Sequence, residues 1–152
     1  MSCLSDIVVR IFFAILSLFY IAAIFILAGS PVVDTLSEFN PYSALHIPLF
    51  GILTFLLIFS MVPITRGFRG ASIQPGSDPR RLPSEETKGL NLRLFLAGAI
   101  ALVVAIFDEI HQLYVPGRDG SAIDAVLDMA GIAIALLLCF RLLKTRFSKY
   151  TK

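Results

Sequence analysis

Polar side chains that could do chemistry gather between residues 108 and 128 of a largely apolar chain. In a helix, Asp108, His111 and Gln112 fall at positions i, i+3 and i+4 and share one face, while Glu109 lies on the neighbouring face with Gln112. An imidazole exchanges a proton near neutral pH, and a carboxylate can orient the imidazole or hold a cation. This segment therefore predicts an acid–base site.

A second group follows, on what reads as the next helix. Asp124 and Asp128 are i and i+4, so they share a face and Asp128 lies about 6 Å further along the axis. Two like charges so placed repel each other unless a positive charge is shared between them. Arg118, whose planar guanidinium suits phosphate or carboxylate, could supply that charge. A divalent cation with Asp124 and Asp128 as oxygen ligands is the other possibility, and the sequence leaves metal dependence open.

A second histidine, His46, begins an earlier apolar segment and is expected at the same membrane level as His111. In the enzyme hypothesis the two imidazoles act as acid and base, and the carboxylates orient them or hold a cation. We predict these catalytic residues: His46, Asp108, Glu109, His111 and Asp128. We predict these substrate-binding residues: Gln112, Arg118 and Asp124.

Several of these residues also have a structural interpretation. Asp124 could belong to a capping box that begins at Ser121, and Arg118 could simply pair with a neighbouring acid. His46 could be an interfacial residue at a helix end, and Glu109 and His111 could face headgroups or water. Asp128 is hardest to explain in this way, because an almost wholly apolar segment follows it. A charge inside a membrane costs at least about 2.5 kcal/mol and is a functional candidate by default.

The composition indicates what positions these groups. The 152 residues are 57% hydrophobic and 16% charged, whereas a soluble domain is about one quarter charged. A net charge of +2 is too small to indicate nucleic acid as a partner. We predict an all-α fold, a single polytopic membrane domain formed by a bundle of four transmembrane helices. The predicted spans are about 11–28, 44–62, 92–112 and 121–141.

The first span could instead be a cleaved signal peptide, but its uncharged segment is longer than the usual core of about 7 to 15 residues. We therefore expect a retained helix. The second span should end before Pro63, because proline disfavours helix at the preceding residue. A Pro-, Gly- and Ser-rich segment then predicts an irregular loop, and we place the whole loop at about 64–91.

The distribution of basic residues predicts the topology. The N-terminus, the segment from Ile64 to Arg93, and the tail from Arg141 hold twelve of the thirteen Lys and Arg residues. The positive-inside rule places these segments, and with them both termini, in the cytoplasm. The polar motif then lies on the extracytoplasmic side of the cell membrane.

The motif resembles that of the VanZ-like family of small bacterial membrane proteins. The matching features are Glu109-X-X-Gln112, Pro116-X-Arg118, Asp124 and Gly131, together with His46 at the start of an earlier span. The resemblance extends over most of the chain in its hydropathy. The family often has lysine where this chain has Ser43, and asparagine where it has Asp128, so the pocket here is more acidic.

The founding member of that family is linked to resistance to the antibiotic teicoplanin, which implies a role in the cell envelope. Our leading hypothesis is an outward-facing pocket that binds a phosphorylated lipid or a lipid-linked glycan, and in the enzyme version also modifies it. Membrane lipids and a lipid-linked envelope precursor are the expected partners. The alternative is a non-catalytic binding or scaffold protein for a lipid or a partner protein. A small transporter is the third option.

Overall fold

The computed structural model describes the backbone of residues 2–28, 42–62, 82–116 and 121–149, and side chains within 4–28, 44–62, 88–116 and 121–143. These residues form four α-helices and one 3-10 helix. In chain order the elements are α1 (Ser2–Ala28), η1 (Tyr42–Leu45), α3 (His46–Met61), α4 (Leu82–Gln112) and α5 (Ala122–Lys149). The predicted all-α fold is confirmed.

Three helices are long and apolar enough to cross a membrane, over Leu4–Ala28, Lys88–Gln112 and Ala122–Leu143. Helix α3 has only 16 residues, about 24 Å at 1.5 Å per residue, less than the hydrocarbon thickness of about 30 Å. The four residues of η1 directly precede it and add about 8 Å. The predicted span 44–62 is therefore a 3-10 turn followed by a short α-helix.

Helices α4 and α5 extend beyond their predicted spans. Helix α4 begins at Leu82, inside the predicted loop at about 64–91, and α5 continues to Lys149. Pro83 falls in the first turn of α4, where its missing N–H removes no helical hydrogen bond. The end of α3 is as expected, because Val62, the residue before Pro63, is extended at φ −90° and ψ 124°.

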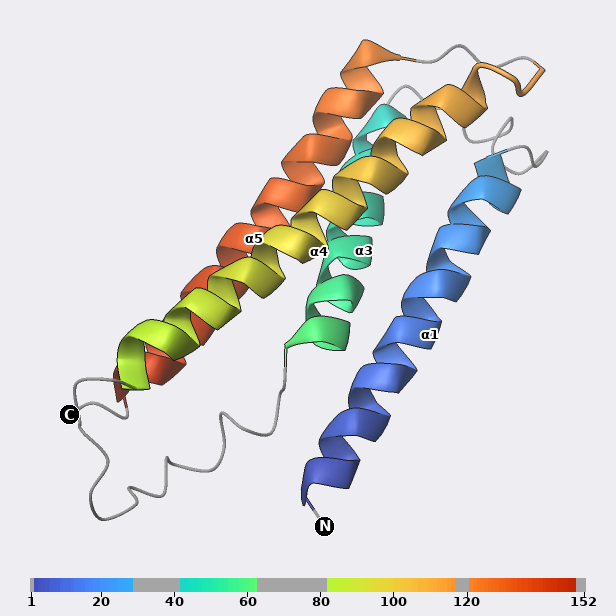
Figure 1. Ribbon diagram of the computed structural model, residues 1–152. Helices are drawn as coiled ribbons and strands as arrows, with labels where there is room; N and C mark the ends of the chain where they lie inside the picture. The colour runs from blue at the N-terminus through green and yellow to red at the C-terminus, as the bar shows by residue number, and fades with distance from the viewer. Residues whose placement is uncertain (1, 29–41, 63–81, 117–120, 150–152) are drawn as a thin grey trace, which may run out of the picture.

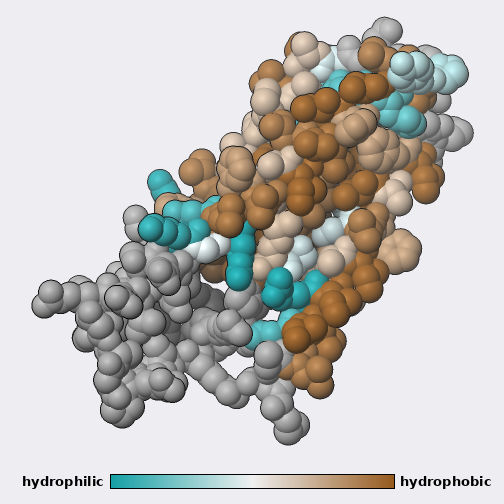
Figure 2. Space-filling view, viewed as in Figure 1, coloured by the Kyte–Doolittle hydropathy of each residue, from teal (hydrophilic) through white to brown (hydrophobic). Residues whose placement is uncertain are grey.

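The helices run alternately up and down, with α3 in contact with α1, α4 and α5 (Figure 1). In that view, α1 ends, α3 begins, α4 ends and α5 begins at the upper end of the bundle. The start of α1 and the end of α5 lie at the opposite, lower end, on different sides of the bundle in this view. Hydrophobic residues cover most of the visible described surface, and hydrophilic residues gather toward its two ends (Figure 2). This distribution suits a bundle surrounded by lipid.

Helices α3 and α4 each turn an apolar stripe toward the core. On α4 the buried residues follow a spacing of three and four and are Leu90, Leu94, Ala97, Ala101 and Ala105. Continued by the same spacing toward the upper end, this stripe reaches Asp108 and Gln112, which are buried too. On α3 the buried stripe of Phe50 and Leu53 starts at His46. The polar residues therefore replace apolar core residues at one end of the bundle.

Hydroxyl groups along the helices donate to their own backbone. Ser17 Oγ donates to the carbonyl of Phe13 at 2.8 Å, and Thr54 Oγ1 to that of Phe50 at 2.7 Å. Such bonds satisfy a hydroxyl where no water is at hand. The carboxylates at the upper end differ, because they accept hydrogen bonds from a side chain one turn away or from another helix.

Candidate functional site

The polar cluster lies at the upper end of the bundle and draws on three helices. His46 comes from α3, Asp108 and Gln112 from α4, and Asp128 from α5. Their exposed fractions are 4%, 2%, 3% and 0%. These groups therefore lie inside the protein, and His46 is not the exposed helix-end residue of the interfacial interpretation.

A hydrogen bond between His46 and Asp128 joins α3 to α5. His46 Nδ1 lies 2.8 Å from Asp128 Oδ1, and His46 Nε2 lies 3.9 Å from Asp124 Oδ2. Because an ionised carboxylate only accepts hydrogen bonds, Nδ1 is the donor to Asp128. Asp128 thereby fixes the orientation of the ring and turns Nε2 toward Asp124, in the first turn of α5.

Helix α4 contributes two carboxylates. Gln112 Nε2 donates to Asp108 Oδ2 at 2.9 Å, as expected of two residues one turn apart on a shared face. Asp108 interacts electrostatically with both His46 and Asp128. Glu109, half-buried, accepts a hydrogen bond from the backbone N–H of Ser121 at 3.1 Å. That bond ties the end of α4 to the start of α5, where the helix dipole also favours an anion.

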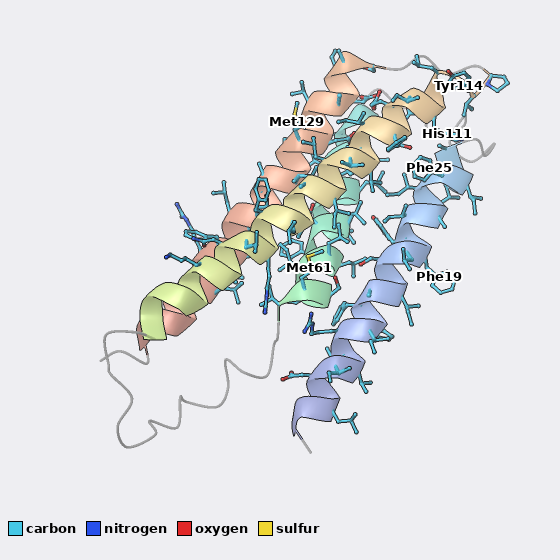
Figure 3. All side chains as sticks on the ribbon, viewed as in Figure 1. Phe19, Phe25, Met61, His111, Tyr114 and Met129 are labelled. Carbon is cyan, nitrogen blue, oxygen red and sulfur yellow. The ribbon has the colours of Figure 1, made fainter. Side chains whose placement is uncertain are left out.

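Two predicted site residues remain, His111 and Arg118. His111 packs edge-on against Phe25 of α1, with ring centroids 5.4 Å apart, near the upper end of the bundle (Figure 3). His111 therefore contacts α1, and it also interacts electrostatically with Asp108. Arg118 lies outside the described residues, and so does the side chain of Ser43.

The carboxylates share an unusual feature, which is that each has a buried oxygen without a hydrogen-bond partner among the described residues. The atoms are Asp108 Oδ1, Glu109 Oε1, Asp124 Oδ1 and Asp128 Oδ2. On Asp108, Glu109 and Asp128 the other oxygen accepts a hydrogen bond. Buried polar atoms are normally paired, so these oxygens are suited to accept hydroxyl donors, protons or a cation.

Three of the side chains also meet the spacing of a metal site. One ligand atom each from His46, Glu109 and Asp128 lies within 4.8 Å of the other two. The sequence suggested Asp124 and Asp128 as metal candidates. The geometry retains Asp128 but groups it with His46 and Glu109 in place of Asp124.

A glycine brings α5 close enough to α3 for the His46–Asp128 bond. A Cβ on Gly131 would overlap the carbonyl oxygen of Ile47 and would lie 3.1 Å from the amide nitrogen of Gly51. Ile47 is the neighbour of His46, and Gly131 follows Asp128 by one turn. The close approach of the two backbones therefore sets the distance that the hydrogen bond spans.

Sequence reasoning missed three contributors. They are Phe25, the backbone N–H of Ser121 and the contact of Gly51 with Gly131. Ser121 does signal a helix start, but nothing in its residue type indicates that its N–H holds Glu109. Small residues at Gly51 and Gly131 do indicate close helix packing, although not which helix meets which.

Comparison with known proteins gives one match. The profile of the VanZ/LLP1 family matches residues 13–144. No similar protein was found among curated proteins, and none among solved structures. The matched range includes His46, the α4 carboxylates, and both aspartates of α5. The chain belongs to the VanZ/LLP1 family.

Proposed function

We propose that this membrane protein of the VanZ/LLP1 family binds the polar headgroup of a phosphorylated lipid or lipid-linked glycan, and that His46 and Asp128 supply acid–base chemistry to it. The proposal rests on one observation. The buried side chain of His46 lies close to carboxylates from two other helices. Ionisable groups at membrane depth are costly and are retained chiefly where they serve a ligand, an ion or a proton.

The distribution of charge supports an extracytoplasmic site. Arg10, Lys88, Arg93 and Arg141 belong to turns toward the lower end of the bundle, opposite the cluster. Arg10 Nε donates to the carbonyl of Ser60 at 3.0 Å, near the lower end of α3. By the positive-inside rule the lower end faces the cytoplasm, and the cluster then meets lipids of the outer leaflet.

The chemistry of the cluster favours a headgroup rich in hydroxyls. Carboxylate oxygens without partners accept hydrogen bonds from sugar hydroxyls, whereas they repel a bare phosphate. Tyr114, just beyond α4, is 81% exposed and offers an aromatic ring at the membrane surface. The phosphate of the ligand would then be bound by Arg118, the residue whose guanidinium suits it.

The His46–Asp128 pair has the form of an acid–base dyad. A carboxylate bonded to one ring nitrogen orients the imidazole and stabilises its protonated form, so the other nitrogen can take a proton from a hydroxyl or water. In the enzyme version, Nε2 of His46 is that nitrogen. Asp128 acts as the positioning residue.

A second candidate, binding without chemistry, is favoured by the burial of His46. Only 4% of this residue is exposed, so a ligand reaches its ring only if the helices move. In this version the half-buried Glu109 and Asp124 contact the ligand. The buried His46 and Asp128 hold α3 and α5 together.

Purified protein in lipid nanodiscs, incubated with a labelled lipid-linked saccharide or a polyprenyl phosphate, tests both versions. The enzyme version predicts product, and Asp128→Asn should lower its rate at least about 100-fold, as loss of an orienting carboxylate can. The binding version predicts saturable binding, no product, and loss of affinity in Glu109→Gln. Asp6→Asn, at the opposite end of the bundle, is the matched carboxylate control. Absence of both product and saturable binding would show the proposal to be wrong.

A further inference from the structure

The structure carries one inference beyond headgroup binding. We propose that His46, Glu109 and Asp128 form a binding site for one divalent transition-metal ion, with Zn²⁺ or Mn²⁺ as its occupant. Each ligand comes from a different helix, and one donor atom from each lies within 4.8 Å of the other two. Around a tetrahedral ion with bonds of about 2.1 Å, donors are about 3.4 Å apart, so side-chain adjustments suffice to close the site.

Two buried carboxylate oxygens are available to bind a cation. Asp128 is 0% exposed, and its Oδ2 has no hydrogen-bond partner among the described residues. Glu109 Oε1 is also a buried atom without a hydrogen-bond partner among the described residues. In Glu109 the other oxygen is held by the N–H of Ser121, whereas Oδ1 of Asp128 is hydrogen-bonded to His46, itself one of the proposed ligands. A hydrogen bond that holds one oxygen and leaves the second available is how outer interactions orient a metal ligand.

Charge balance supports the same conclusion. Four carboxylates, those of Asp108, Glu109, Asp124 and Asp128, lie near His46, and His111 interacts electrostatically with Asp108. Asp108 and Glu109 both interact electrostatically with Asp128. Buried like charges are tolerated only when something positive offsets them. A divalent ion offsets two of these charges and would also use the unpartnered oxygens.

The donor set selects the class of ion. One imidazole nitrogen and two carboxylate oxygens suit Zn²⁺ or Mn²⁺, whereas Ca²⁺ and Mg²⁺ prefer ligand sets made of oxygen alone. Three protein ligands leave a further position open, as in catalytic zinc sites. That position would accept water or an oxygen of the headgroup. This role of the ion rests on the proposed function, whereas binding of the ion does not.

Metal binding has a defined proton balance. The proton that His46 Nδ1 donates to Asp128 Oδ1, atoms 2.8 Å apart, would move to Nε2 of the same ring, so that neutral His46 binds the ion through Nδ1. The two atoms would then separate by about 0.6 Å to reach the ligand spacing of a tetrahedral ion. No redox change is involved.

The test uses the full chain in nanodiscs, stripped with a chelator and titrated with Zn²⁺ by calorimetry, with bound metal counted after dialysis. We expect one ion per chain, and at least a tenfold loss of affinity in Glu109→Gln, His46→Gln and Asp128→Asn. Asp6→Asn should bind as the unmodified chain does. Absorption of the Co²⁺-loaded protein should show d–d bands typical of nitrogen and oxygen ligands.

Substoichiometric metal in the unmodified chain, or unchanged affinity in Glu109→Gln, would overturn the inference. Glu109 is half-buried at the rim, so Glu109→Gln remains informative even if the two buried variants fail to fold, as circular dichroism would reveal. Headgroup binding measured with and without chelator separates the two proposals. Metal bound without any lipid binding would refute only the proposed function. Lipid bound by a protein that takes up no metal would refute only the metal site.

Discussion

Replacing Gly131 with alanine should separate α3 from α5 and so weaken the polar cluster. The added Cβ would overlap the carbonyl oxygen of Ile47, and it would lie 3.1 Å from Gly51 N where ordinary contacts begin at 3.4 Å. Both neighbours are backbone atoms, so neither can rotate away. Overpacking of this kind costs about 1–3 kcal/mol. A displacement of about 1 Å at a functional group can also cost about 100-fold in activity.

Gly51 provides the matched control, because it lies opposite Gly131 in the same interface. Its added Cβ would sit 3.6 Å from the carbonyl oxygen of Gly131, an ordinary contact. Both substitutions gain about 1 kcal/mol of helix propensity, so the difference between the two variants isolates the steric cost. Gly89→Ala, with nothing within 4 Å of the new Cβ, should show the propensity gain alone.

The assay is the free energy of unfolding in mixed micelles, followed by circular dichroism, together with Zn²⁺ affinity. We expect Gly131→Ala to be less stable than Gly51→Ala by about 1–3 kcal/mol and to bind Zn²⁺ more weakly. Equal stability and equal affinity of these two variants would refute the argument that the glycine contact sets the His46–Asp128 distance.

Three further predictions follow from the same geometry. Asp128→Asn and His46→Gln should each destabilise the fold by about 3–5 kcal/mol, the cost of breaking a buried charged pair. A double-mutant cycle should show coupling, and strictly additive losses would contradict the 2.8 Å hydrogen bond. Gln112→Met removes the donor to Asp108 and should cost about 1–3 kcal/mol in unfolding experiments; no loss would mean that Asp108 has another partner. In a background without the two native cysteines, Tyr114→Cys should react with a membrane-impermeant maleimide in intact cells; labelling only after permeabilisation would place the cluster in the cytoplasm.

The fold was largely predictable because long apolar segments have few alternatives in a membrane. Apolar length alone located the four helices, and Pro63 correctly predicted the end of α3. The 3-10 turn before His46 was not predictable, since nothing in the residues of η1 distinguishes a 3-10 from an α-helical turn. The early start of α4 was missed because Pro83 and Ser84 are typical of loops as well as of a first helical turn.

Within the site, contacts inside one helix were predictable and contacts between helices were not. The i, i+4 spacing of Asp108 and Gln112 predicted a shared face, and the two side chains are hydrogen-bonded. His46 and Asp128 are 82 residues apart, so their meeting depends on how α3 packs against α5. The rotation of α4 likewise decides that Asp108 points into the core while His111 contacts Phe25.

The central claim, that the buried polar cluster serves a ligand instead of merely holding helices together, can be tested by native mass spectrometry. The unmodified protein, Glu109→Gln and Asp6→Asn would be released from nanodiscs that contain a lipid-linked saccharide. We predict that the unmodified protein and Asp6→Asn retain the saccharide lipid, and that Glu109→Gln loses it while keeping its helical content. Equal retention by all three proteins, or by none, would contradict the claim.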